Sequence, residues 1–251
     1  MKPEIKIAHL ADIHVKFGGA THEDYRVVFN RTLKDIREQE PNRIMIAGDL
    51  VHNKINLSPN QISLLSEFIV GLSRIAPTDI ICGNHDVNLS HLGQGDAIEV
   101  IFKMAEQLDN NNQLFLVNEE NKNKIDYWKK AAYYYPNSDF YDLGNNVVLG
   151  VFSCKDNKQI IVEDKDPDKY YIAMWHGMLY GSRMDNGFQI KDDKLVKPST
   201  FEGFDLVCIG DIHEFQTFEM EHEIEVDESE LQNYIDEGWG LIEQKQEILN
   251  G

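Results

Sequence analysis

The sequence predicts an α/β fold, and two patterns in the first 110 residues support this prediction. Short apolar runs at residues 5–10, 44–47 and 80–82 have the length of buried strands. Segments with apolar residues at helical spacing follow these runs. Because strands and helices alternate at this spacing, we expect a parallel sheet built from βαβ units.

Each expected helix has its own signal. The first is indicated by apolar residues at helical spacing, namely Tyr25, Val28, Phe29, Leu33 and Ile36. The second begins at Ser58, which can cap it, and Gln61 completes a capping box. Pro59 suits the first helical position. A third helix is expected over residues 96–108.

The second half of the chain has fewer helical stretches. Apolar runs at residues 147–152, 171–175 and 206–209 predict three more strands. The polar segments 155–169 and 181–200 are typical of loops. This half is therefore expected to be richer in strands than the first.

The composition changes near residue 218, where we place a domain boundary. Residues 1–218 form the expected globular domain, and residues 219–251 form an acidic tail with an amphipathic helix over 228–249. The tail holds eleven acidic residues and one basic residue, so it carries −10 of the net charge of −19. A protein that binds polyanions on its own surface is usually basic, and this chain has 24 Lys and Arg against 43 Asp and Glu.

We expect a globular cytoplasmic protein. Its 251 residues are 42% apolar and 27% charged, which is typical of globular chains. No apolar run reaches the ~18 residues of a membrane span, and the N-terminal segment MKPEIKIAHLADIH lacks a signal-peptide pattern. The three cysteines lie far apart, which indicates reduced thiols rather than a disulfide framework or a thiolate zinc site.

Five polar clusters each follow directly on an expected strand. They are Asp12 with His14; Gly48 with Asp49; Gly83, Asn84, His85 and Asp86; His176 with Gly177; and Gly210, Asp211 and His213. Functional groups of α/β sheets gather in the loops at the carboxyl edge, so we expect these clusters to converge on one cleft. The neighbouring glycines would let the backbone approach a bound ion closely.

The residue types in these clusters are those of a metal site. Asp, His and Asn side chains bind Mn²⁺, Fe²⁺ or Mg²⁺ more readily than they bind thiolate-preferring metals. Seven candidate ligands exceed the needs of one ion. Two ions that share a bridging carboxylate would use them all.

The order of the clusters resembles that of the calcineurin-like metallophosphoesterases, whose motifs are DxH, GD, GNH(D/E), H and GHxH. Here they read DIH, GDLVH, GNHD, WHG and GDIH, and the resemblance spans residues 4–216. It implies a metallophosphoesterase-type β-sandwich flanked by helices, in α/β/β/α layers, with no evident cap domain. Within that superfamily, AGDLVH before a Ser-Pro helix start and the final GDIHEFQ are similar to the SbcD-type DNA repair nuclease, the bacterial relative of the Mre-eleven nuclease.

The resemblance implies a role for each matched residue. One ion would be held by Asp12, His14 and His213, the second by Asn84, His176 and Asp211, and Asp49 would bridge them. His85 would stabilise or protonate the leaving oxygen, and Asp86 would orient His85 from behind. The ions, Mn²⁺ first with Mg²⁺ and Fe²⁺ as alternatives, would activate a bridging hydroxide for in-line attack.

The chain departs from the family pattern in two places. Asp211 stands where the last motif normally has His, and a carboxylate there adds negative charge and favours harder ions. SbcD-type enzymes also continue into a cap that reads DNA and a helical segment that binds the SbcC-type (Rad-fifty) ATPase. Here an acidic tail follows instead, so a truncated, interrupted or divergent form is expected, with a phage-type protein as one alternative.

Three functions stay open at this point. The first is a two-metal phosphodiesterase of the SbcD type that cuts DNA in repair, recombination or replication, as an exonuclease or endonuclease. Its partners would be DNA, an SMC-like SbcC-type ATPase and a second copy of the chain. The second is a calcineurin-like phosphoesterase that acts on a small phosphodiester, a nucleotide or a phosphoprotein. The third is a catalytically weak subunit of an SMC-like ATPase complex.

A few residues outside the clusters have two readings. His52 follows the GDLV segment and is a candidate for substrate contact, with a plain loop histidine as the alternative. His9 lies inside an expected strand, and we expect it to be a core histidine. The three tyrosines at 133–135 are expected at a strand or core edge rather than stacked on bases.

Overall fold

A computed structural model describes residues 4–16, 22–54, 57–91, 95–108, 114–156, 158–183 and 187–212. The chain divides into two units, residues 1–218 and 219–251, and the second unit lies outside the described residues. The amphipathic helix expected over 228–249 therefore stays a prediction.

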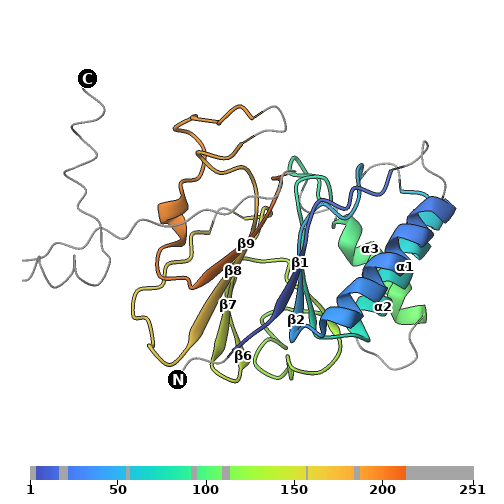
Figure 1. The fold of residues 1–251 in the computed structure, drawn as a ribbon, viewed down its shortest axis with the longest axis horizontal. Coiled ribbons are helices and arrows are strands. Elements are labelled where there is room, and N and C mark those ends of the chain that lie inside the picture. Colours follow the sequence, from blue (N-terminus) through green and yellow to red (C-terminus); the bar gives the residue numbers. More distant parts are fainter. Residues whose placement is uncertain are drawn as a thin grey trace, which may run out of the picture. The chain divides into compact units, whose positions relative to one another are not determined.

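The first layer of the fold is a five-stranded sheet in which all neighbouring strands are parallel. Its strands lie in the order β1 (Ile7–Leu10), β2 (Arg43–Ala47), β3 (Thr78–Ile81), β5 (Ala132–Tyr134) and β4 (Leu114–Leu116). One face is covered by helices α1 (His22–Gln39), α2 (Pro59–Ser73) and α3 (Ala97–Leu108), as Figure 1 shows. The predicted parallel sheet of βαβ units is confirmed in this half of the chain.

A second sheet packs against the other face of the first (Figure 1). Its strands lie in the order β6 (Asp139–Gly144), β7 (Val147–Phe152), β8 (Tyr170–His176) and β9 (Leu206–Gly210). β6 and β7 are antiparallel, whereas β7, β8 and β9 are parallel. The outer face of this sheet carries the 3₁₀ helix η2 (Pro198–Phe201), whose Phe201 packs edge-on against Phe152. The predicted α/β class, with two packed sheets and flanking helices, is confirmed.

Alternate residues of the central strands face two different cores, because successive side chains of a strand point to opposite sides. Ile44 and Ile46 of β2 pack with the helices, and Met45 between them packs between the two sheets. Tyr134 faces the helices, whereas the neighbouring tyrosines at 133 and 135 face the second sheet. All three tyrosines are 0% exposed, and Tyr133 and Tyr134 lie in β5, so the predicted strand position is confirmed for these two, and all three lie in the core rather than at its edge.

The start of α2 fixes the segment that follows β1. The predicted capping box is confirmed, since the Gln61 N–H donates to Ser58 Oγ at 3.3 Å and the Ser58 N–H donates to Gln61 Oε1 at 2.9 Å. Gln61 Nε2 also donates to the carbonyl of Val15 at 3.1 Å. One side chain therefore ties the helix end to the chain just beyond His14.

One core assignment made from the sequence is wrong. His9 lies in β1 as expected, but its side chain is exposed. β1 is an edge strand, and the second sheet packs chiefly on β2 and β3. A polar face on an edge strand is ordinary, and alternation alone cannot show which strand of a sheet is the edge.

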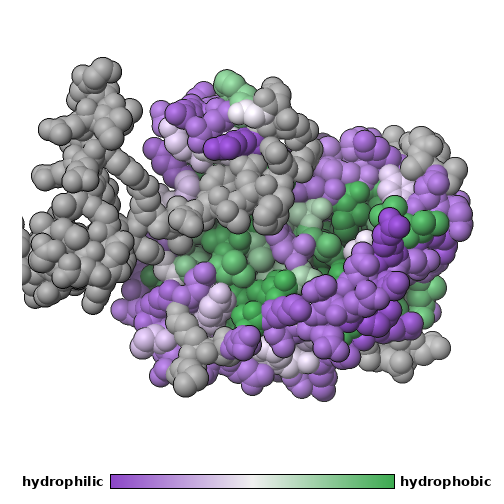
Figure 2. All heavy atoms as spheres, viewed as in Figure 1, coloured by the Kyte–Doolittle hydropathy of each residue, from purple (hydrophilic) through white to green (hydrophobic). Residues whose placement is uncertain are grey.

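The surface of the helix layer is polar. In the view of Figure 2, most of the surface over α1 is hydrophilic, and hydrophobic residues gather between the helices and the second sheet. Val27 and Val28 of α1 are exposed exceptions. α1 buries Phe29 and Ile36, and Tyr25 and Leu33 pack partly buried against the same core, as the predicted apolar stripe requires. The sequence also assigns Val28 to this stripe, and that assignment is wrong, because Val28 is 56% exposed. None of the described helices is long and apolar enough to span a bilayer.

Candidate metal centre

The predicted clusters lie where strands of the two sheets end. Asp12 and His14 follow β1, Asp49 follows β2, residues 83–86 follow β3, His176 ends β8, and Asp211 follows β9. Two contacts join these ends across the sheets. His176 Nδ1 lies 2.8 Å from the carbonyl oxygen of Ala47. The N–H of Asp211 lies 3.0 and 2.9 Å from the two carboxylate oxygens of Asp12.

Four of the predicted ligands have a left-handed backbone. The φ angles are 54° for Asp12, 46° for His14, 55° for Asp49 and 73° for Asp211. This conformation costs roughly 1–2 kcal/mol for an ordinary L-residue and persists where surrounding contacts impose it, often at functional sites. Here the His14 N–H donates to the Asp49 carbonyl at 2.9 Å. This hydrogen bond joins the segment that contains His14 to the segment that contains Asp49.

Two glycines of the clusters allow neighbouring strand ends to pack closely. A Cβ atom on Gly83 would lie 2.1 Å from Asp49 Oδ1, and one on Gly210 would lie 2.0 Å from the Ala47 carbonyl oxygen. Both positions therefore need glycine so that neighbouring strand ends and their side chains can approach each other. The expected close approach of the backbone to a bound ion stays a prediction.

Four side chains form an oxygen-rich cluster, which we call the carboxylate group: Asp12, Asp49, His176 and Asp211. Each offers a ligand atom within 4.8 Å of the others. Asp49 Oδ2 lies 3.4 Å from His176 Nε2. Both atoms are buried, yet neither makes a hydrogen bond with any residue that the structure describes. Buried polar atoms are nearly always paired, so this arrangement fits a divalent cation.

The charged side chains of the carboxylate group shift each other's pKa values. Burial lowers the pKa of His176, but the facing Asp49 carboxylate outweighs it and raises the pKa to about 9. Burial likewise opposes ionisation of Asp49, but His176 outweighs it, and the pKa of Asp49 is lowered. In the absence of a cation, an imidazolium proton therefore compensates the carboxylates. A divalent ion would compete with that proton for the same atoms.

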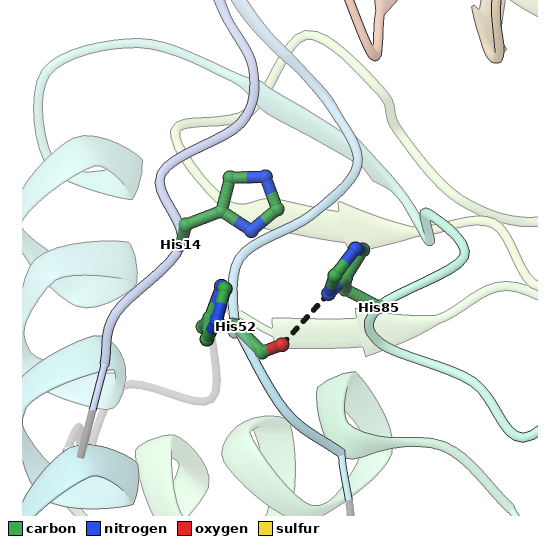
Figure 3. A group of neighbouring side chains, drawn as sticks. All are labelled: His14, His52 and His85. Carbon is green, nitrogen blue, oxygen red and sulfur yellow. Dashed lines mark hydrogen bonds between the residues drawn. The ribbon is translucent and has the colours of Figure 1, made fainter.

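Three imidazoles form a second cluster, the histidine group: His14, His52 and His85 (Figure 3). The His14 ring centroid lies 4.9 Å from that of His85 and 5.6 Å from that of His52. His14 Nε2 also lies 3.4 Å from Asp49 Oδ2, so His14 joins the two groups. His52, predicted only as a substrate contact, is thus brought beside the predicted ligands.

The expected role of Asp86 is corrected. Its carboxylate accepts the N–H of Val51 at 3.0 Å and the N–H of Gly83 at 2.9 Å. His85 Nδ1 lies instead 2.7 Å from the carbonyl oxygen of His52, which therefore orients the ring. Asp86 is fully buried, and burial raises its pKa to about 7. Asp86 holds two ligand-bearing loops together rather than acting on His85.

Two further predicted ligands are Asn84 and His213. Asn84 is exposed on the turn after β3, and its role as a ligand stays a prediction. His213 lies outside the described residues. The sequence interpretation missed Lys54, whose Nζ donates to the Asn84 carbonyl at 2.8 Å. Its position two residues after His52 in the same loop is the signal that points to it.

Two packed sheets with carboxylates and imidazoles gathered at their carboxyl ends form a candidate site for divalent cations. The sequence pattern of the calcineurin-like phosphoesterases matches residues 5–215, and the chain belongs to this family. Its members hydrolyse phosphoesters with divalent metal ions, so the predicted superfamily and the coarse class of metal-dependent hydrolase are confirmed. The phosphodiesterase and nuclease activities stay predictions.

The chain is also similar to a viral protein whose name assigns no activity. It is 30% identical over 269 aligned residues to "Uncharacterized protein R555" of Acanthamoeba polyphaga mimivirus. The alignment covers 99% of this chain and 18% of that relative, so the chain spans less than a fifth of the relative's length. The SbcD-type branch therefore stays a prediction.

Proposed function

We propose that the chain is a two-metal phosphodiesterase that acts on DNA, in the manner of the SbcD-type nucleases. The observation that supports this best is the position of Asp49, whose Oδ2 lies 3.4 Å from both His14 Nε2 and His176 Nε2. A carboxylate between two sets of ligands can serve two ions. When bound, divalent ions, Mn²⁺ in the first place, would supply positive charge and an activated water.

His85 is the group proposed to move a proton. In the tautomer whose Nδ1–H donates to the His52 carbonyl, its Nε2 is the nitrogen that can hold or release a proton. Delivery of that proton to the leaving oxygen is general acid catalysis. The exposed His52 ring stacks 5.5 Å from His85 and is proposed to contact a substrate phosphate.

The negative charge of the chain bears on the substrate. With a net charge of −19, the chain needs another source of positive charge to hold DNA. We propose that bound ions and an SbcC-type (Rad-fifty) ATPase partner supply it, in a cytoplasmic assembly that can include a second copy of the chain. The same charge favours the rival function, hydrolysis of a small phosphodiester, nucleotide or phosphoprotein.

Hydrolysis assays separate these functions. End-labelled duplex DNA, hairpin DNA and a chromogenic phosphodiester are incubated with the chain and Mn²⁺, Mg²⁺ or a chelator. We expect Mn²⁺-dependent DNA cleavage that is lost in Asp49→Asn by at least about 100-fold, the scale for removal of one group that stabilises transition-state charge. Asp193→Asn is the matched control, since the Asp193 side chain is 87% exposed and lies outside both groups.

Each other outcome has a definite meaning. Cleavage of the chromogenic diester alone would transfer the proposal to small substrates. No hydrolysis of any substrate with any ion would favour a catalytically weak subunit of an ATPase complex. DNA cleavage that persists in Asp49→Asn would contradict the site itself.

A further inference from the structure

We propose that the centre is chemically asymmetric and that Asp211 makes one half of it selective for oxygen-preferring ions such as Mg²⁺ and Mn²⁺. The inference rests on the two-ion centre of the proposed function and deepens it. It concerns the carboxylate group, while His85 and His52 keep the proton-transfer and substrate-contact roles proposed for them. It also proposes a chemical role for Asp211, the residue that departs from the family motif.

The position of Asp211 is fixed by the fold. It follows β9, where Gly210 pairs with His176 of β8. Its own N–H donates to both carboxylate oxygens of Asp12, at 3.0 and 2.9 Å. Its carboxylate offers an oxygen within 4.8 Å of ligand atoms of Asp12, Asp49 and His176. Asp211 therefore belongs to the carboxylate group by geometry as well as by motif.

The two groups offer different donor atoms. The carboxylate group has three carboxylates and one imidazole. It includes Asp49 Oδ2 and His176 Nε2, which lie 3.4 Å apart and make no hydrogen bond of normal length among the described residues. Asp49 is 0% exposed and His176 is 6% exposed, so these atoms face the interior of the site. The histidine group has three imidazoles, and Asp49 Oδ2 is 3.4 Å from His14 Nε2 of that group.

Carboxylate and imidazole donors select different ions. Carboxylate oxygens suit Mg²⁺ and Mn²⁺, whereas imidazole nitrogens suit Zn²⁺ and Fe²⁺. With His in place of Asp211, the carboxylate group would gain a neutral nitrogen donor and lose an anionic oxygen donor. Asp211 therefore biases this half toward hard ions and strengthens the attraction for any cation.

Metal binding measured without substrate tests the inference. The metal-free chain is titrated with Mn²⁺, free Mn²⁺ is followed by its electron paramagnetic resonance signal, and Zn²⁺ is then added as a competitor. We expect Asp211→His to raise the preference for Zn²⁺ over Mn²⁺ by about tenfold, the scale on which groups around a metal change its affinity. Asp211→Asn, which keeps an oxygen donor but removes the charge, is expected to weaken Mn²⁺ binding without that gain for Zn²⁺.

Both variants are expected to fold, because Asn and His are among the residues that tolerate a left-handed backbone, and the N–H to Asp12 is kept. Asp193→Asn is again the matched control. Unchanged Mn²⁺ and Zn²⁺ binding in both Asp211 variants would overturn the inference and leave the proposed function standing. A wild-type chain that binds no Mn²⁺ would overturn both.

Discussion

The buried charged side chains at the two ends of β2 and β3 differ in how completely they are hydrogen-bonded. At their amino ends, Arg43 and Asp79 form a fully buried pair with two N–O distances of 2.7 Å. Tyr135 also donates to Asp79, and Arg43 also donates to the Tyr127 carbonyl. At the carboxyl end of β2, the equally buried Asp49 keeps one oxygen without a hydrogen bond among the described residues.

The comparison shows that one end of these strands stabilises the fold and that the other end carries the candidate metal centre. A buried ion pair whose hydrogen bonds are all made has nothing left to offer a ligand. A buried carboxylate oxygen that faces two imidazole nitrogens is unfavourable by itself and becomes favourable when a cation arrives. The same strands therefore carry a structural pair at one end and a binding site at the other.

The largest expected effect is on stability, and it concerns the buried pair of Arg43 and Asp79 at the amino ends of β2 and β3. Asp79→Ala leaves the Arg43 charge buried without its partner, which we expect to lower the free energy of unfolding by about 3–5 kcal/mol. Urea denaturation at neutral pH measures it. The double variant Arg43→Met with Asp79→Leu should recover most of that loss, and a double variant as unstable as Asp79→Ala would show that the pair itself stabilises the fold.

The pH dependence of the stability of the metal-free chain tests the charges at the carboxyl ends of the strands. The pKa of His176 is raised from 6.5 to about 9. The protonated imidazole therefore contributes fully to stability below pH 6.5, and this contribution is lost as the pH rises to about 9. We expect a loss of no more than about 3 kcal/mol. Denaturation over this range with chelator present measures it, and His176→Gln should flatten the dependence; an unchanged slope would contradict the assignment.

Metal addition is expected to stabilise the chain only through the candidate metal centre at the carboxyl ends of the strands. Mn²⁺ at about 100 times its dissociation constant is expected to raise the free energy of unfolding by about 2.7 kcal/mol. Thermal unfolding at a fixed pH with and without the ion provides the measurement. The gain should persist in Asp193→Asn and be absent in Asp49→Asn, and an equal gain in Asp49→Asn would place the ion elsewhere.

The smallest effect concerns the helix that supports the site. Ser58→Ala removes the side chain that accepts the Gln61 N–H, with an expected cost of about 1 kcal/mol. Chemical denaturation measures this cost, and Ser63→Ala, within the same helix, is the control. A loss in Ser58→Ala no larger than that in Ser63→Ala would mean that the capping box adds nothing to stability.

The sequence by itself determined the local features of this protein. The capping box at Ser58 and the apolar stripe of α1 depend on residues a few positions apart, so their spacing is enough to predict them. The residue types of the clusters likewise indicated a metal-binding chemistry before any geometry was known. The family match to residues 5–215 agrees with that reading of the motifs.

Only the tertiary structure decided how those residues are grouped. His176 meets Ala47 across 129 residues of sequence, and Asp211 meets Asp12 across 199. No local pattern specifies which strand ends will touch, because that depends on how two sheets pack. The same reason explains why Asp86 binds backbone N–H groups instead of His85, why His52 joins His14, and why His9 is exposed on an edge strand.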